Sequence, residues 1–358
     1  MEARNEIRRR ERVSDSNLLF AIAAVIFVLM YGFGILSHPE NFLQPQTFFD
    51  LFNLNAPLII LTLAESIVMV GGGIDISIGQ VTALVTMSCA LFLQSGTGSV
   101  VGSLLLALGI GVAFGLLQGF LVAYLRVQPF IITLSGMFMA SGLLTVIHEN
   151  PINLTRPDFL NLMNFQIVIP WLGTLNRLGH FIPLQIMAGT IVVLVLIVVL
   201  VILMKWSRFG RNLYAVGGNN QSALMLGINV KRTKFYSYVL CGLLSGVAGF
   251  VFLMQTGAGN VGNAYGFEIK AVAGSIIGGT MLIGGVGNLI GSPIGALTLL
   301  TINELIRSAG VNSDFQAIVS GMLLCIFIVL QNVVMRLRGS GSLKLALPGW
   351  LLPARRAR

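Results

Sequence analysis

The sequence predicts an all-α polytopic membrane protein with about ten transmembrane helices, some of them discontinuous. Hydrophobic residues make up 55% of the 358 residues, charged residues make up only 10%, and the mean hydropathy is +0.88. A soluble domain carries roughly 25% charged residues, so this composition excludes an ordinary soluble protein. No polar stretch is long enough for a soluble domain of ~100 residues, and nearly the whole chain is therefore expected to be membrane domain and connecting loops.

Apolar runs of about 20 residues, the length that crosses a bilayer core as a helix, recur along the chain. The first run is longer than the apolar region of a signal peptide and lacks a following A-x-A site, so we predict a retained span. The predicted spans are Leu18–Leu36, Leu54–Val70, Asp75–Gln94, Ser99–Leu125, Val127–Ile147, Leu184–Met204 and Phe235–Gln255, two within Glu268–Ile306, and Phe315–Val334.

The positions of the basic residues predict the orientation. Arginines precede the first apolar run, and arginines and a lysine follow the last one, so the positive-inside rule places both termini in the cytoplasm and requires an even number of spans. We predict a cytoplasmic N-terminus over 1–17, a transmembrane domain over 18–335 and a cytoplasmic tail over 336–358. Segment 148–183 is then periplasmic and the basic segment 205–234 cytoplasmic. This distribution explains the net charge of +9 without nucleic acid.

Glycine interrupts the apolar sequence in both halves of the chain. Gly71, Gly72 and Gly73 separate the second and third predicted spans, and eight glycines with one proline fall within 274–296. Interrupted spans in both halves are typical of a translocation pathway. Close helix packing through small residues is the alternative, and both stay open. The candidate pathway glycines of the second half are Gly278, Gly279, Gly284 and Gly285.

Two carboxylates, Glu65 and Asp75, flank the first glycine break. An ionisable residue at bilayer depth is costly, so each should face protein, water or a partner. We predict that Asp75 is the N-cap of the third span, because its carboxylate would accept hydrogen bonds from first-turn N–H groups that find no water in a membrane. Direct substrate contact by Asp75 stays open, as do a pathway role and a packing role for Glu65. Ser77 completes the candidate set at this break.

Four further ionisable residues lie in the predicted spans of the second half. Glu304 and Arg307 are three positions apart, so they can pair on one helix face, and we interpret this pair as structural. Glu268 and Lys270 are two positions apart, do not share a helix face, and are interpreted as marking the external end of a span.

The cytoplasmic segment contains YAVGGNNQSALMLGINV. Between Gly218 and Gly227 lies a stretch that begins with capping-type residues and is long enough for about two helical turns. Such a helix can dock into a groove on another protein. An ordinary surface helix is the alternative, and the residue chemistry alone does not separate the two.

Three stretches taken in order, GGGIDISIG, YAVGGNNQSALMLGINV and IIGGTMLIGGVGNLIGSPIGAL, resemble the successive signatures of ABC-type sugar importer permeases. The resemblance is to the ribose/galactofuranose branch, close to the branched-chain amino-acid permeases, and covers about residues 20–335. PFIITLSGMF, NPIN and RPDF are most similar to the galactofuranose-type subunit. Ile76 replaces the common leucine of the first signature, which changes no expectation.

The resemblance implies a type II ABC importer-like fold in the bacterial inner membrane and import of a monosaccharide such as ribose or galactofuranose. Asn219 to Leu226 would be the coupling helix, held in a cleft of a separate cytoplasmic ATP-binding subunit. Leu224 and Met225 stand where basic or small residues are common, so this partner is expected to be a particular one. The other implied partners are a second permease copy or paralogue, a periplasmic sugar-binding protein and membrane lipid. The candidate coupling residues are Gly217, Gly218, Asn219, Asn220, Ser222, Ala223, Gly227 and Ile228.

The chain is not expected to be an enzyme. It contains no GxxxxGK[ST] motif and no Gly-Lys pair, so ATP hydrolysis is expected in a partner chain. An intramembrane enzyme is disfavoured because all three histidines fall in predicted exterior loops. The three cysteines lie in apolar runs without CxxC spacing, and we expect no metal and no cofactor. An ion-coupled secondary transporter of a small polar solute and an ABC permease for amino acids or nucleosides stay as alternatives.

Overall fold

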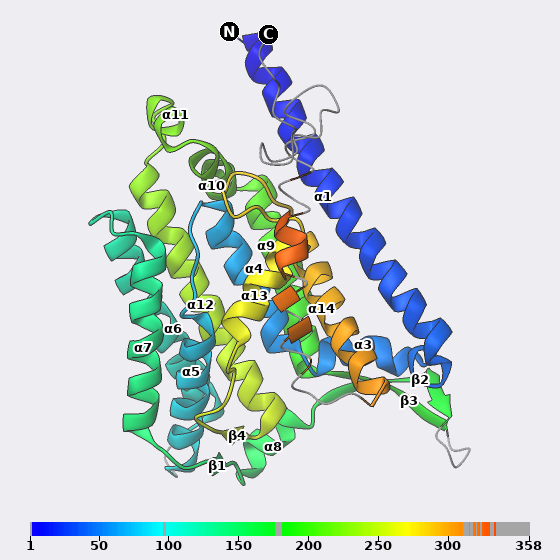
Figure 1. Ribbon diagram of the computed structural model, residues 1–358. Coiled ribbons are helices and arrows are strands. Elements are labelled where there is room, and N and C mark those ends of the chain that lie inside the picture. Colours follow the sequence, from blue (N-terminus) through cyan, green and yellow to red (C-terminus); the bar gives the residue numbers. More distant parts are fainter. Residues whose placement is uncertain are drawn as a thin grey trace, which may run out of the picture.

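The computed structural model describes residues 2–95, 98–175 and 181–310, and, beyond these, residues 315, 318, 319, 321, 322, 324–329 and 333. The predicted tail over 336–358 and most of the last predicted span lie outside the described residues. The described chain is mostly helical (Figure 1), which confirms the predicted fold class.

The first half of the chain forms seven helices of very different length within the described residues. They are α1 (Glu2–Ser37), α2 (Pro39–Phe42), α3 (Pro45–Asn53), α4 (Ala56–Val70), α5 (Ile78–Gln94), α6 (Val100–Ala123) and α7 (Pro129–Ile147). Prolines at the first turns of α2, α3, α4 and α7 favour these starts, because proline lacks only an N–H that has no helical partner there.

The second half contains β1 (Ile152–Asn153), α8 (Pro157–Met163), β2 (Gln166–Leu175), β3 (Phe181–Met187), α9 (Ala188–Trp206), α10 (Arg208–Gly218), α11 (Asn220–Met225), α12 (Val230–Thr256), β4 (Ala258–Gly259), α13 (Phe267–Ile277) and α14 (Gly291–Ser308). Strands β2 and β3 pair antiparallel, as do β1 and β4. Helices α10 and α11 lie at the end of the molecule remote from α8, β1 and β4 (Figure 1).

Helix α4 is the centre of the core. Every one of its 15 residues is buried, which is the environment that a helix apolar on all sides requires. Helices α9 and α12 contribute to the core cluster around it. By contrast, α1, α6, α7 and α9 expose large apolar side chains, including Leu29, Leu105, Phe138 and Val195. Exposed apolar faces on long helices are what lipid contact requires, so the structure is that of a multi-pass membrane protein.

Helices α6 and α12 pack backbone against backbone. A Cβ atom added to Gly111 would lie 2.2 Å from the carbonyl oxygen of Gly242, and one added to Gly246 would lie 2.4 Å from that of Ala107. This is the small-residue packing that brings membrane helices close together. In these two helices glycine allows close packing of the backbones.

Within the described residues, five helices are long and apolar enough to cross a membrane, and the pair α3 and α4, bent by 60°, is a sixth candidate. The prediction of ten spans therefore stays a prediction. Two details differ from it. Helix α13 has only 11 residues, about 16 Å, which is too short for a bilayer core of ~30 Å. The predicted span beginning at Leu184 starts four residues later, because Leu184 to Met187 belong to β3.

Candidate functional site

Five glycines from three segments that are far apart in the sequence meet near α10. The N–H of Gly285 donates to the carbonyl oxygen of Val70, the last residue of α4, at 2.9 Å. A Cβ atom added to Gly217 would lie 1.8 Å from that same oxygen. One added to Gly285 would lie 2.4 Å from the Cα of Gly218. We call this contact the glycine junction, formed by Gly72, Gly217, Gly218, Gly284 and Gly285.

Backbone conformation is the second reason for glycine at the junction. The φ angles of Gly72, Gly284 and Gly285 are +77°, +87° and +73°. This left-handed region carries a steric cost for residues with a Cβ atom, and glycine adopts it readily. The junction therefore joins three segments in one contact: the first helix break (71–77, between α4 and α5), the second helix break (278–290, between α13 and α14) and the end of α10. These glycines therefore both interrupt helices and allow close backbone packing.

Helix α10 is fixed to both breaks by its buried face. Leu213 is fully buried, and its side chain lies where a Cβ atom on Gly71 would be. The hydroxyl of Tyr214 donates to the carbonyl oxygen of Gly287 at 2.9 Å. Burial raises the pKa of Tyr214 to about 12, so the hydroxyl keeps its proton and its donor role at neutral pH.

Helix α11 follows α10 directly and exposes an apolar tip. The side chain of Asn219 caps it by accepting from the N–H of Ser222 at 2.9 Å, and Ala223 is buried. Leu224, Met225 and Leu226 are 66%, 88% and 77% exposed. The turn closes at Gly227, with φ +76°, and the N–H of Ile228 donates to the carbonyl oxygen of Ala223. Two of the three predicted coupling glycines, Gly217 and Gly218, thus lie in the junction, and the third, Gly227, follows this helix.

Next to the first break lies a buried polar network. The N–H of Asp75 donates to both carboxylate oxygens of Glu65, at 3.2 and 3.3 Å. Ser77 donates to Asp75 Oδ1 through its N–H at 2.9 Å and its hydroxyl at 2.6 Å, and Gln118 Nε2 donates to Ser77 Oγ at 2.8 Å. The network joins α4, the break, α5 and α6, which stabilises the extended segment between two helices.

The structure corrects the predicted role of Asp75. Helix α5 begins at Ile78 with Ser77 as its N-cap residue, and no side chain caps it. The carboxylate of Asp75 accepts from Ser77, two residues along the chain, and so closes a turn ahead of the helix. Asp75 is 2% exposed and Glu65 is fully buried. In this conformation both carboxylates stabilise the break, and contact of Asp75 with a substrate stays an open alternative.

Sequence reasoning did not single out Gln118 or Tyr238. The Tyr238 hydroxyl donates to the carbonyl oxygen of Ile74 at 3.5 Å, and a Cβ atom on Gly73 would lie 2.4 Å from that hydroxyl. Both residues carry a polar group inside an apolar span. A polar side chain there needs a hydrogen-bond partner, and this is the feature of the sequence by which both could have been found.

Loss of the Ser77 side chain tests this network. Ser77→Ala removes a donor to Asp75 and the acceptor for Gln118 in a buried site, so we expect the folded state to lose about 1–3 kcal/mol. The measurement is the thermal unfolding midpoint of the purified chain. Ser135→Ala is the matched control, because this exposed hydroxyl donates to Ile131 of its own helix and to no other described residue. Equal midpoints for the two variants would contradict a stabilising network.

A family comparison decides what kind of protein carries this site. The family described as "Branched-chain amino acid transport system / permease component" matches residues 47–328, which include the glycine junction and the polar network. The chain belongs to this permease family.

The permease is also similar to individual transport proteins over most of its length. It is 33% identical to the fructose import permease protein FruG of Bifidobacterium longum, over 91% of this chain and 94% of that protein. It is 33% identical to the inner membrane ABC transporter permease protein YjfF of Escherichia coli, over 88% and 92%. It is 30% identical to the ribose import permease protein RbsC of Escherichia coli, over 88% and 91%. No solved structure matches the chain.

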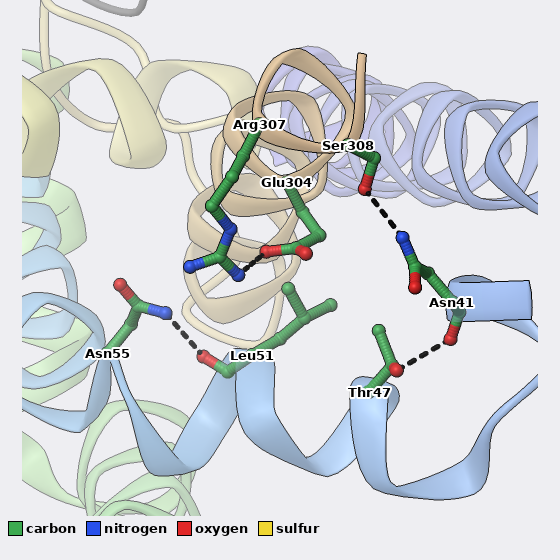
Figure 2. Close-up of polar contacts among 7 residues, drawn as sticks. All are labelled: Asn41, Thr47, Leu51, Asn55, Glu304, Arg307 and Ser308. Carbon is green, nitrogen blue, oxygen red and sulfur yellow. Dashed lines mark hydrogen bonds and ion pairs between the residues drawn. The ribbon is translucent and has the colours of Figure 1, made fainter. Parts of the chain in front are cut away.

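Three of the four ionisable residues predicted in the second half line a polar pocket between α3, α4, α13 and α14, namely Lys270, Glu304 and Arg307. Glu304 and Arg307 form the predicted ion pair in the last turns of α14 (Figure 2). Glu268 and Lys270 lie in the first turns of α13, and Lys270 lines the pocket, whereas Glu268 does not. The structure therefore separates these two residues, as their spacing predicts.

Proposed function

We propose that the permease is the membrane-spanning subunit of an ABC importer that moves a monosaccharide across the bacterial inner membrane. The observation that carries the proposal is the similarity to sugar import permeases over about nine tenths of the chain. The family description names branched-chain amino acids, but the relatives that match over most of the chain carry fructose and ribose in their names. Galactofuranose is a further candidate, from the resemblance alone.

Energy for transport comes, in this proposal, from a separate ATP-binding subunit. The absence of a GxxxxGK[ST] motif from the sequence supports this, since such a motif is what holds nucleotide phosphates in most ATPases. The proposed assembly further contains a second permease copy or paralogue, a periplasmic sugar-binding protein and the surrounding lipid. The basic flanks of the chain support cytoplasmic termini.

Helix α11 is the proposed contact with the ATP-binding subunit. Its exposed apolar tip of Leu224, Met225 and Leu226 would be costly to leave in water, and a helix groove on a partner would cover it. The basic residues of 205–234 support a cytoplasmic place for this helix.

The glycine junction is the proposed route from the ATP-binding subunit to the translocation pathway. A movement of α11 shifts α10, and α10 is in backbone contact with both helix breaks. Backbones that pack directly against each other, without side chains between them, deform little. A displacement of α10 is therefore passed on to α4 and to the segment before α14. Alternating access then follows if the two nucleotide states favour different positions of the junction.

Reconstitution tests the proposed function. The complex of the permease, its ATP-binding subunit and its binding protein in proteoliposomes should accumulate a monosaccharide only when ATP is supplied to the nucleotide-binding side. Parallel assays with leucine and a nucleoside separate sugar import from the other ABC substrate classes. Accumulation by the permease alone, driven by an ion gradient without ATP, would instead support a secondary transporter and overturn the proposal.

A further inference from the structure

The pocket between α3, α4, α13 and α14 has the size and chemistry of a small-molecule site. Its volume is about 270 Å³. Pockets for drug-sized ligands run from about 300 to 1,000 Å³, so this one suits a smaller molecule. Its lining includes Thr47 of α3, Asn55 before α4, and Glu304 and Arg307 of α14, all of which are drawn in Figure 2. It lies far along α4 and α14 from the glycine junction.

The charged groups of the pocket cancel. Asp50 and Glu304 are acidic, whereas Lys270 and Arg307 are basic, so two negative and two positive side chains give a net charge of zero. An anionic ligand would meet two carboxylates, and a cationic ligand would meet an ammonium and a guanidinium group. A neutral ligand with hydroxyl groups can donate hydrogen bonds to the carboxylates and accept them from the ammonium and guanidinium groups, because a hydroxyl is both a donor and an acceptor.

Hydrogen-bonding capacity in the pocket is not used up by the chain itself. The Asn303 Oδ1 atom is buried and has no hydrogen-bond partner among the described residues. Lys270 forms no ion pair within the part of the chain that the structure describes, and its Nζ lies 5.8 Å from the ring centre of Phe267. A buried acceptor without a donor is costly, so a ligand hydroxyl that donates to Asn303 would be favoured.

We propose that this pocket is a binding site for a neutral monosaccharide within the permease, with Asn303 as a hydroxyl acceptor, Lys270 as a donor and the Phe267 ring as an apolar contact. This inference rests on the proposed function for the choice of sugar among neutral polyols. Helix α4 runs from the pocket to the first break, and α14 runs from the second break to the pocket. A movement of the glycine junction therefore reaches both helices that form the site.

The test uses sugar protection of a cysteine in the assembled complex. In a Cys325→Ser background, Leu54→Cys places a thiol in the pocket, because Leu54 lines it and is 44% exposed. D-fructose and D-ribose should slow maleimide labelling of Leu54→Cys about fivefold, whereas gluconate and glucosamine should not. Trp171→Cys on the β2 strand, where Trp171 is 83% exposed and does not line the pocket, should label at the same rate with and without sugar.

A second pair of variants shows whether Asn303 binds the sugar. Asn303→Leu keeps the approximate side-chain volume and removes the acceptor, so protection should need about fivefold more sugar and ATP-driven uptake should fall similarly. Thr301→Val is the control on the same helix, because its hydroxyl donates to Leu297 within α14 and does not line the pocket.

The outcomes separate the two proposals. If the complex imports sugar but no sugar protects Leu54→Cys, or Asn303→Leu behaves as Thr301→Val does, the pocket is not the binding site and the proposed function stands. Stronger protection by gluconate or glucosamine overturns the assignment to a neutral ligand. If the complex imports leucine and no sugar, the proposed function itself fails.

Discussion

Gly217→Ala is expected to lower ATP-driven uptake strongly, because the new Cβ atom would lie 1.8 Å from the Val70 carbonyl oxygen and 2.7 Å from the Gly285 nitrogen. Both atoms belong to the backbone and to one hydrogen bond, so no side-chain rotation relieves the clash. Overpacking of this kind costs about 1–3 kcal/mol, and separation of α10 from the breaks should lower uptake about tenfold or more. The measurement is uptake by the reconstituted complex, normalised to the amount of permease in the membrane.

Gly109→Ala is the matched control for this substitution. It makes the same chemical change within α6, where an added Cβ would meet nothing within 4 Å among the described atoms. Alanine is the better helix former, so we expect unchanged uptake and a stability gain of about 0.5–1 kcal/mol. If Gly217→Ala were as active as Gly109→Ala, the junction would not be a tight backbone contact during transport.

Leu224→Asp combined with Met225→Asp is expected to remove binding of the ATP-binding subunit. Each leucine or methionine that is fully buried at an interface contributes about 1.5–3 kcal/mol, so the double variant should weaken association about a hundredfold or more. The two side chains are 66% and 88% exposed, so the permease is expected to fold without them. The measurement is the dissociation constant between the purified permease and the ATP-binding subunit.

Tyr265→Asp is the control for an exposed residue turned acidic. Tyr265 is 81% exposed and precedes α13, away from α11. Its variant should bind the ATP-binding subunit as the unchanged permease does. Wild-type affinity of the α11 double variant would show that the partner docks elsewhere.

Much of the architecture could be predicted from the sequence. Long apolar runs predict α1, α6, α7, α9 and α12 because a helix that crosses lipid must satisfy its own backbone. The break at Gly71 to Gly73 could also be predicted, since consecutive glycines do not continue a helix well. The pairing of Glu304 with Arg307 follows from local spacing, and the structure confirms it.

What the sequence did not reveal depends on contacts between distant segments. The meeting of Gly72, Gly217 and Gly284 joins residues more than sixty positions apart, and no local propensity encodes it. The N-cap residue of α5 is Ser77 and not the predicted Asp75. The Asp75 carboxylate accepts from the N–H of Ser77, and the N–H of Asp75 donates to Glu65, so Asp75 lies in a turn ahead of the helix. The sequence does not predict the pairing of β2 with β3 either, because a polar interval between two spans indicates only a segment outside the membrane.

The central claim is that α11 and the second break move as one body through the glycine junction. Spin labels at Asn220→Cys on α11 and Ile283→Cys beside Gly284, in the Cys325→Ser background, measure this directly in the assembled complex. Ile283 is 77% exposed and therefore accepts a label. A third label at Leu125→Cys, at the end of α6, serves as the reference outside the junction. We predict that the Asn220–Ile283 distance stays constant between the nucleotide-free and ATP-bound states while the Ile283–Leu125 distance changes. A change in the Asn220–Ile283 distance with a constant Ile283–Leu125 distance would contradict the account.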